Sequence, residues 1–82
     1  MARATYYAAL PVIDAGGGRL TLGPVMELES EYAAIARAGN FWAEKNAGGV
    51  AFSRTGDPET TVFDPIVILA RFGDVPDDLS TL

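Results

Sequence analysis

The pattern of apolar and polar positions in the first 28 residues predicts an antiparallel hairpin. Residues 5–13 form an apolar run with aromatic and β-branched ends, which favours a strand. Residues 19–28 alternate polar with apolar side chains on both sides of Gly23 and Pro24, so we expect a second arm with a kink at that point. The three glycines at 16–18 supply the turn between the arms.

From Glu31 onwards the spacing of the apolar residues becomes that of a helix. Ser30 is a good N-cap, and apolar residues recur at intervals of three and four from Glu31 onwards. Lys45 and the glycines at 48 and 49 predict the C-terminal end of the helix. Phe41 falls on the side away from the expected core. The stripe that we expect to be buried consists of Tyr32, Ile35, Ala36, Gly39, Trp42 and Ala43.

Two further strands complete the expected fold. Residues 50–54 and 66–72 have strand patterns, and a polar loop over 55–64 joins them. The pattern predicts a single α+β domain over 1–82, in the order β-β-α-β-β, with a four-stranded antiparallel or mixed sheet and one helix packed on one face. Since the strand at 66–72 is apolar on both faces, we expect it to be central, in the strand order 2-1-4-3. An acidic tail follows from about residue 74.

The composition excludes several kinds of catalytic and metal-binding site. The chain has no histidine and no cysteine, which excludes a Ser-His-Asp triad, a Cys-His pair and the usual zinc sites. We therefore expect no cofactor, no metal and, on balance, no enzyme activity.

The net charge of −5 disfavours binding to nucleic acid and to anionic membranes. No apolar run approaches the roughly 20 residues of a membrane helix, and the cytoplasm is the expected location.

Three stretches resemble a group of small uncharacterised bacterial proteins. They are AFSRTGDP at 51–58, ILARFGDVPDDL at 68–79, and the opening YYAALP at 6–11. The resemblance covers most of the chain and implies a bacterial, cytosolic protein. It implies no activity, ligand or catalytic residue.

The best local candidate for polar chemistry is the loop that contains Ser53, Arg54 and Asp57. The Arg54 guanidinium would bind a carboxylate or phosphate through two parallel hydrogen bonds. The more ordinary alternative is that Asp57 caps the turn and Arg54 is solvated or paired with it, as is common in hairpin loops. The carboxylates of this loop do not have the spacing of an EF-hand, so no metal site is predicted.

The chain also has more apolar strand surface than one helix covers. Large exposed apolar patches usually mark an interface, so we expect a homodimer through the sheet face that lacks the helix. The alternative is that the tail folds back and covers this face with Val75, Leu79 and Leu82. The candidate interface residues are Tyr6, Leu10, Phe41, Val67 and Leu69.

Two functions remain open on these grounds. The first is a non-enzymatic protein-interaction or accessory module that acts as a homodimer, with another protein as a further partner. The alternative is a small-ligand-binding domain or weak enzyme that uses residues 53–57. A concave pocket beside Arg54 would favour the alternative.

Overall fold

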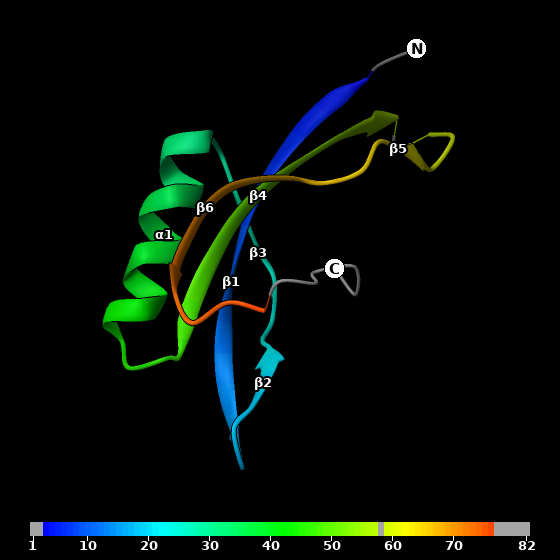
Figure 1. The fold of residues 1–82 in the computed structure, drawn as a ribbon. Coiled ribbons are helices and arrows are strands. Elements are labelled where there is room, and N and C mark those ends of the chain that lie inside the picture. The colour runs from blue at the N-terminus through cyan, green and yellow to red at the C-terminus, as the bar shows by residue number, and fades with distance from the viewer. Residues whose placement is uncertain (1–2, 58, 77–82) are drawn as a thin grey trace.

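The computed structural model describes residues 3–57 and 59–76 and confirms the α+β class (Figure 1). The sheet has six strands rather than the expected four, and the order β-β-α-β-β is wrong because both outer strands are divided. The elements are β1 (Ala4–Gly16), β2 (Arg19–Leu22), β3 (Met26–Leu28), α1 (Glu31–Ala43), β4 (Gly48–Asp57), β5 (Val62–Phe63) and β6 (Val67–Gly73).

The long strands β1 and β4 form the centre of the sheet. They pair antiparallel from Ala4 opposite Gly56 to Val12 opposite Gly48. Strands β2 and β3 share the outer position beside β1, while β5 and β6 share the position beside β4, and every pairing is antiparallel. The predicted kink is the break between β2 and β3. There the Gly23 N–H still donates to the Pro11 carbonyl, at 2.8 Å.

The expected strand order is wrong, because the apolar strand at 66–72 lies at the edge as β6 and β4 is central. The reason is the helix, which crosses β4 closely. A Cβ atom built on Gly49 would overlap the carbonyl of Ala38, so only a strand with a glycine at this point can lie under the helix. Strand β6 has apolar side chains on both faces, because neighbouring residues of a strand point to opposite sides of the sheet. Ile68 packs on one face of the sheet, and Leu69 packs on the other.

The start of the helix is confirmed and its end is not. The Ser30 hydroxyl oxygen accepts a hydrogen bond from the Ala33 N–H at 3.1 Å, as an N-cap does. The helix ends at Ala43, and Lys45 follows with a φ of 72°. The glycines at 48 and 49, expected as a C-cap, instead open β4.

The helix buries only part of the predicted stripe, since Ile35 packs against the apolar core but most of the other positions are exposed. Its fully buried residues are Ala34 and Ala38, and Phe41 packs beside them. Tyr32 is 82% exposed and Trp42 is 51% exposed. The close crossing on β4 leaves room for alanine but not for a large ring, so the helix turns its small residues toward the sheet.

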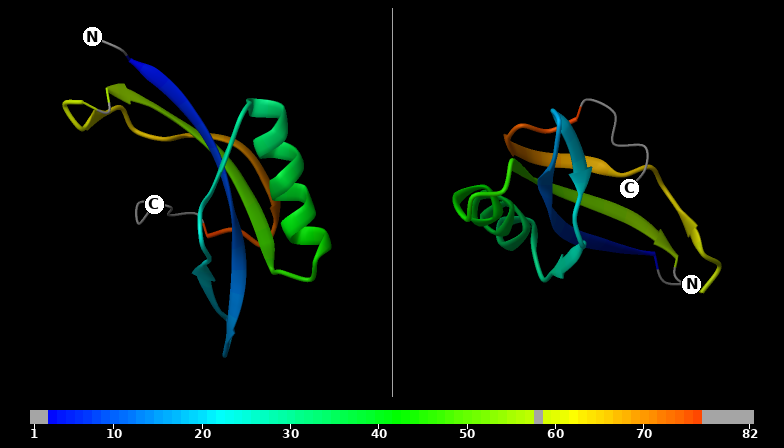
Figure 2. Two further views of the ribbon diagram at one scale, coloured as in Figure 1. Left: turned by 180° about the vertical axis from the view of Figure 1, so that it is seen from behind. Right: turned by 90° about the horizontal axis from the view of Figure 1, so that it is seen from below.

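The curled sheet has an apolar core on each face, and α1 covers one of them (Figure 2). We call these the helix-side core and the opposite-side core. The helix-side core contains Ala9, Ala34, Ala38 and Ala51, with Tyr7, Leu28, Ile35, Phe41, Leu69, Ala70 and Phe72 packed around them. The opposite-side core contains Ala8, Leu10, Val12, Val50 and Phe52, with Leu22, Ala47, Ile66, Ile68 and Val75 packed around them.

Segments outside the helix cover part of the opposite-side core. Leu22 comes from β2, Ile66 precedes β6, and Val75 follows it. Val75 is one of the three tail residues expected to do so; the other two, Leu79 and Leu82, lie outside the described residues. Over residues 3–57 and 59–76, no helix has the length and apolar character needed to cross a membrane.

Candidate ligand-binding pocket

An open pocket of about 390 Å³ lies on the sheet face opposite the helix. Its lining is mostly apolar and carries one cation and one anion. The lining residues are Tyr6, Ala8, Val25, Glu27, Phe52, Arg54 and Phe63. They come from β1, β3, β4, β5 and the link before β3.

Strand register explains why these side chains meet. Tyr6 lies opposite Arg54 in the pairing of β1 with β4, and Ala8 lies opposite Phe52. On its other side, Ala8 lies opposite Glu27 of β3. Directly opposite residues share a face of the sheet, so all five point the same way. The small side chain of Ala8 at the centre of this group leaves the space that larger neighbours surround.

The Arg54 side chain contains the least satisfied polar atom of the pocket. Its Nε is buried and has no hydrogen-bond partner among the described residues. Arg54 also forms no ion pair in the described part of the chain. The ion pair found there joins Arg3 and Asp64. The Arg54 guanidinium therefore lines the pocket without a hydrogen-bond partner among the described residues. Buried groups of this kind are uncommon in folded proteins.

Phe63 forms the rim on the β5 side. Its ring lies 6.2 Å from the Tyr6 ring, centroid to centroid, at an angle of 54°. Phe63 lies opposite Gly56 in the pairing of β4 with β5, and a Cβ atom on Gly56 would overlap the Phe63 ring. A glycine at this point therefore lets the ring lie against the backbone of β4.

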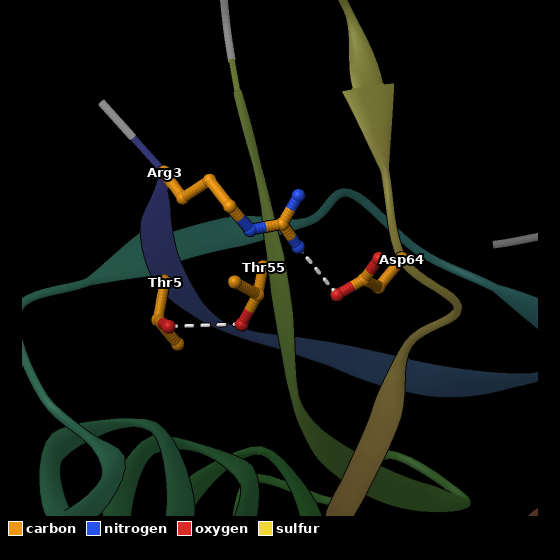
Figure 3. A network of polar contacts seen from close by, with 4 residues as sticks. All are labelled: Arg3, Thr5, Thr55 and Asp64. Atoms are coloured by element: carbon orange, nitrogen blue, oxygen red, sulfur yellow. Dashed lines mark hydrogen bonds and ion pairs between the residues drawn. The ribbon is translucent and has the colours of Figure 1, made fainter. Parts of the chain in front are cut away.

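A small polar network holds the segment that follows Phe63 (Figure 3). The Asp64 N–H donates to the Thr55 carbonyl at 2.8 Å, and Arg3 Nη2 donates to Asp64 Oδ2 at 2.6 Å. The hydroxyls of Thr5 and Thr55 are hydrogen-bonded at 2.9 Å. These contacts link the start of β1 to the chain beyond β5, and so help to fix the rim of the pocket.

Of the three polar residues singled out from the sequence, only Arg54 lies in the pocket. Ser53 is its neighbour on β4 and lies opposite Tyr7, on the helix side of the sheet. Asp57 Oδ1 accepts the Glu59 N–H at 2.9 Å, which is the turn-capping role of the ordinary alternative. The three are separated because β4 continues to Asp57, where the sequence suggested a loop.

The five candidate interface residues do not share one face. Tyr6 lines the pocket, and Leu10 is fully buried in the opposite-side core. Phe41 and Leu69 pack against the helix-side core. Val67 is 57% exposed on the edge strand β6.

Sequence reasoning missed Glu27 as a pocket residue because it assumed that the alternation of faces continues unchanged across the kink at Gly23 and Pro24. The break before β3 reverses the alternation, so that Leu22 packs in the opposite-side core while Leu28 packs in the helix-side core. Glu27 therefore faces the pocket. The dipeptide Gly23-Pro24 was the signal for this reversal. No comparable sequence signal marked the other pocket residues Val25, Phe52 and Phe63.

No three histidine, cysteine, aspartate or glutamate residues of the described ranges are placed to hold a metal ion. Comparison with known proteins finds no family model, no curated protein and no solved structure that matches this chain.

Proposed function

We propose that this chain binds a small molecule with an apolar, ring-sized body and a carboxylate group, in the pocket opposite the helix. The observation that carries the proposal is the Arg54 guanidinium, which lines the pocket and forms no hydrogen bond or ion pair with another described residue. An anion bound in the pocket would supply an acceptor for the guanidinium N–H groups.

A carboxylate suits this site for geometric reasons. The planar guanidinium pairs with a carboxylate through two parallel hydrogen bonds. The surrounding Phe52 and Phe63 side chains lower the local dielectric, which strengthens such a contact. The same rings favour edge-to-face or offset contacts with a ring in the ligand. A volume of about 390 Å³ is at the small end of ordinary ligand pockets.

Ligands with several negative charges fit less well. Arg54 is the one cation among the seven lining residues, and Glu27 lies in the same wall. The chain as a whole carries a net charge of −5. Both features repel phosphate-rich ligands, so we propose a monocarboxylate rather than a nucleotide. Because the sequence contains neither histidine nor cysteine, we infer a binding function rather than catalysis.

Phenylacetate is a suitable probe for this proposal. We expect a titration followed by amide NMR to shift the signals of Tyr6, Phe52 and Arg54 in the wild-type chain. Arg54→Met should weaken binding at least about tenfold, because a charge-assisted contact is worth roughly 1.5–3 kcal/mol. Arg71→Met, which removes an exposed cation on β6, is the matched control and should bind as the wild type does.

The fold of the Arg54→Met variant is checked separately. Since the Arg54 Nε has no partner in the described chain, its removal leaves no other group unpaired. We expect the free energy of unfolding to change by less than about 1 kcal/mol. Absence of shifts with the wild-type chain, or equal binding by Arg54→Met and Arg71→Met, would contradict the proposal.

Self-association is a second proposal for the same face. Val25 and Phe63 at the pocket are exposed apolar side chains. A homodimer or a complex with another protein would bury them. Sedimentation equilibrium at protein concentrations of tens of micromolar tests for the homodimer. A homodimer predicts a mass near that of two chains, and a mass near that of one chain would contradict it.

A further inference from the structure

The pocket has a second charged wall residue, Glu27, which the carboxylate proposal does not use. Glu27 reaches the pocket from β3, and Arg54 reaches it from β4. Strand β1 lies between them, because it pairs with β3 on one side and with β4 on the other. The two opposite charges therefore lie on opposite sides of the same apolar hollow.

These charges are too far apart at the backbone to form a simple cross-strand pair. Glu27 is opposite Ala8, whereas Arg54 is opposite Tyr6. With strands about 4.8 Å apart and a rise of about 3.4 Å per residue, two strand steps and two residues separate the Cα atoms by about 12 Å. No ion pair between Glu27 and Arg54 is present in the described residues. A ligand body above Ala8 would fill the space between the two charges.

We propose that the ligand is zwitterionic, with an amine held by Glu27 at the end opposite the carboxylate held by Arg54. This inference rests on the proposed function. It identifies the ligand class as an aromatic amino-carboxylate whose two charges are separated by a ring. A simple α-amino acid does not meet this requirement, because both of its charges are attached to one carbon atom.

Two probes that differ by one aminomethyl group on the ring test the inference. They are phenylacetate and 4-(aminomethyl)phenylacetate, each titrated against the wild-type chain, Glu27→Gln and Glu29→Gln. Glu29 is an exposed carboxylate two residues away that does not line the pocket, so its variant controls for the loss of one negative charge. We expect the wild type to bind the amine-bearing probe about three- to fivefold more tightly, the range of an exposed ion pair.

Glu27→Gln should abolish this preference and leave phenylacetate binding intact, while Glu29→Gln should retain the preference. Equal binding of both probes by the wild type, or a preference that survives in Glu27→Gln, would overturn the zwitterion inference. In those outcomes Arg54-dependent binding of phenylacetate would still support the proposed function. If neither probe binds the wild type, the proposed function fails and the inference fails with it.

Discussion

The carbonyl of Ala38 lies against Gly49, at the point where α1 crosses β4. A Cβ atom built on Gly49 would overlap this carbonyl. The contact explains two features of the fold together. It places a glycine-bearing strand beneath the helix, and it turns Ala34 and Ala38 rather than Tyr32 and Trp42 toward the sheet.

Gly49→Ala should therefore destabilise the protein. The added methyl group must push the helix away from β4, and overpacking of this kind costs about 1–3 kcal/mol or more. Urea denaturation monitored by circular dichroism measures the loss. An unchanged unfolding free energy would mean that the helix does not cross β4 so closely.

Gly39→Ala is the matched control for that variant. A Cβ atom on Gly39 would lie 3.6 Å from the Phe72 ring, which is an ordinary contact. Since alanine is favoured over glycine in a helix by about 1 kcal/mol, we expect Gly39→Ala to be as stable as the wild type or more stable.

Ser30→Ala should lower the unfolding free energy by about 1 kcal/mol. It removes the side-chain oxygen that accepts the Ala33 N–H at the start of α1. Thermal unfolding gives the measurement. Ser30→Asp keeps an acceptor at the N-cap and should remain close to the wild type, whereas equal losses in both variants would show that the cap is not the cause.

The ion pair between Arg3 and Asp64 should contribute little to stability, although it bridges distant segments. The two side chains are 51% and 57% exposed. A double-mutant cycle with Arg3→Ala and Asp64→Ala should give a coupling energy below about 1 kcal/mol, which salt should reduce further. A coupling above about 2 kcal/mol would contradict this expectation and assign the pair a larger role in holding the pocket rim.

Leu69 and Val67 should respond differently to a new charge. Leu69 packs against the helix-side core, so Leu69→Asp buries an unpaired carboxylate and should unfold the domain. Val67 is exposed on β6, so Val67→Asp should leave the fold intact. Circular dichroism and sedimentation of both variants test this. A folded Leu69→Asp chain of reduced mass would instead place Leu69 in an interface between chains.

Several expectations that depended on neighbouring residues are supported by the structure, although the C-cap at 48 and 49 is not. The Ser30 cap follows from local hydrogen bonding and is present as predicted. The turn at 16–18 follows from glycine's access to positive φ, which all three glycines adopt. The capping role of Asp57, the ordinary alternative for that residue, is likewise a contact within its own turn.

The features that tertiary packing decides were predicted wrongly or not at all. The face presented by α1 depends on the contact of Ala38 with Gly49, and the central place of β4 depends on the same contact. The orientation of Glu27 depends on the break before β3, which reverses the alternation of the strand. Sequence periodicity predicts which residues share a face, but not which element that face will meet.

The sequence by itself determined the α+β class, the start of the helix, the glycine turn at 16–18 and Arg54 as the cation to examine. Only the tertiary structure decided the strand order and the pocket, which joins Arg54 to Tyr6, Glu27 and Phe63. The physical reason is the range of the interactions. Caps and turns are stabilised within a few residues, whereas the pocket requires four strands to pair in one register around the small side chain of Ala8.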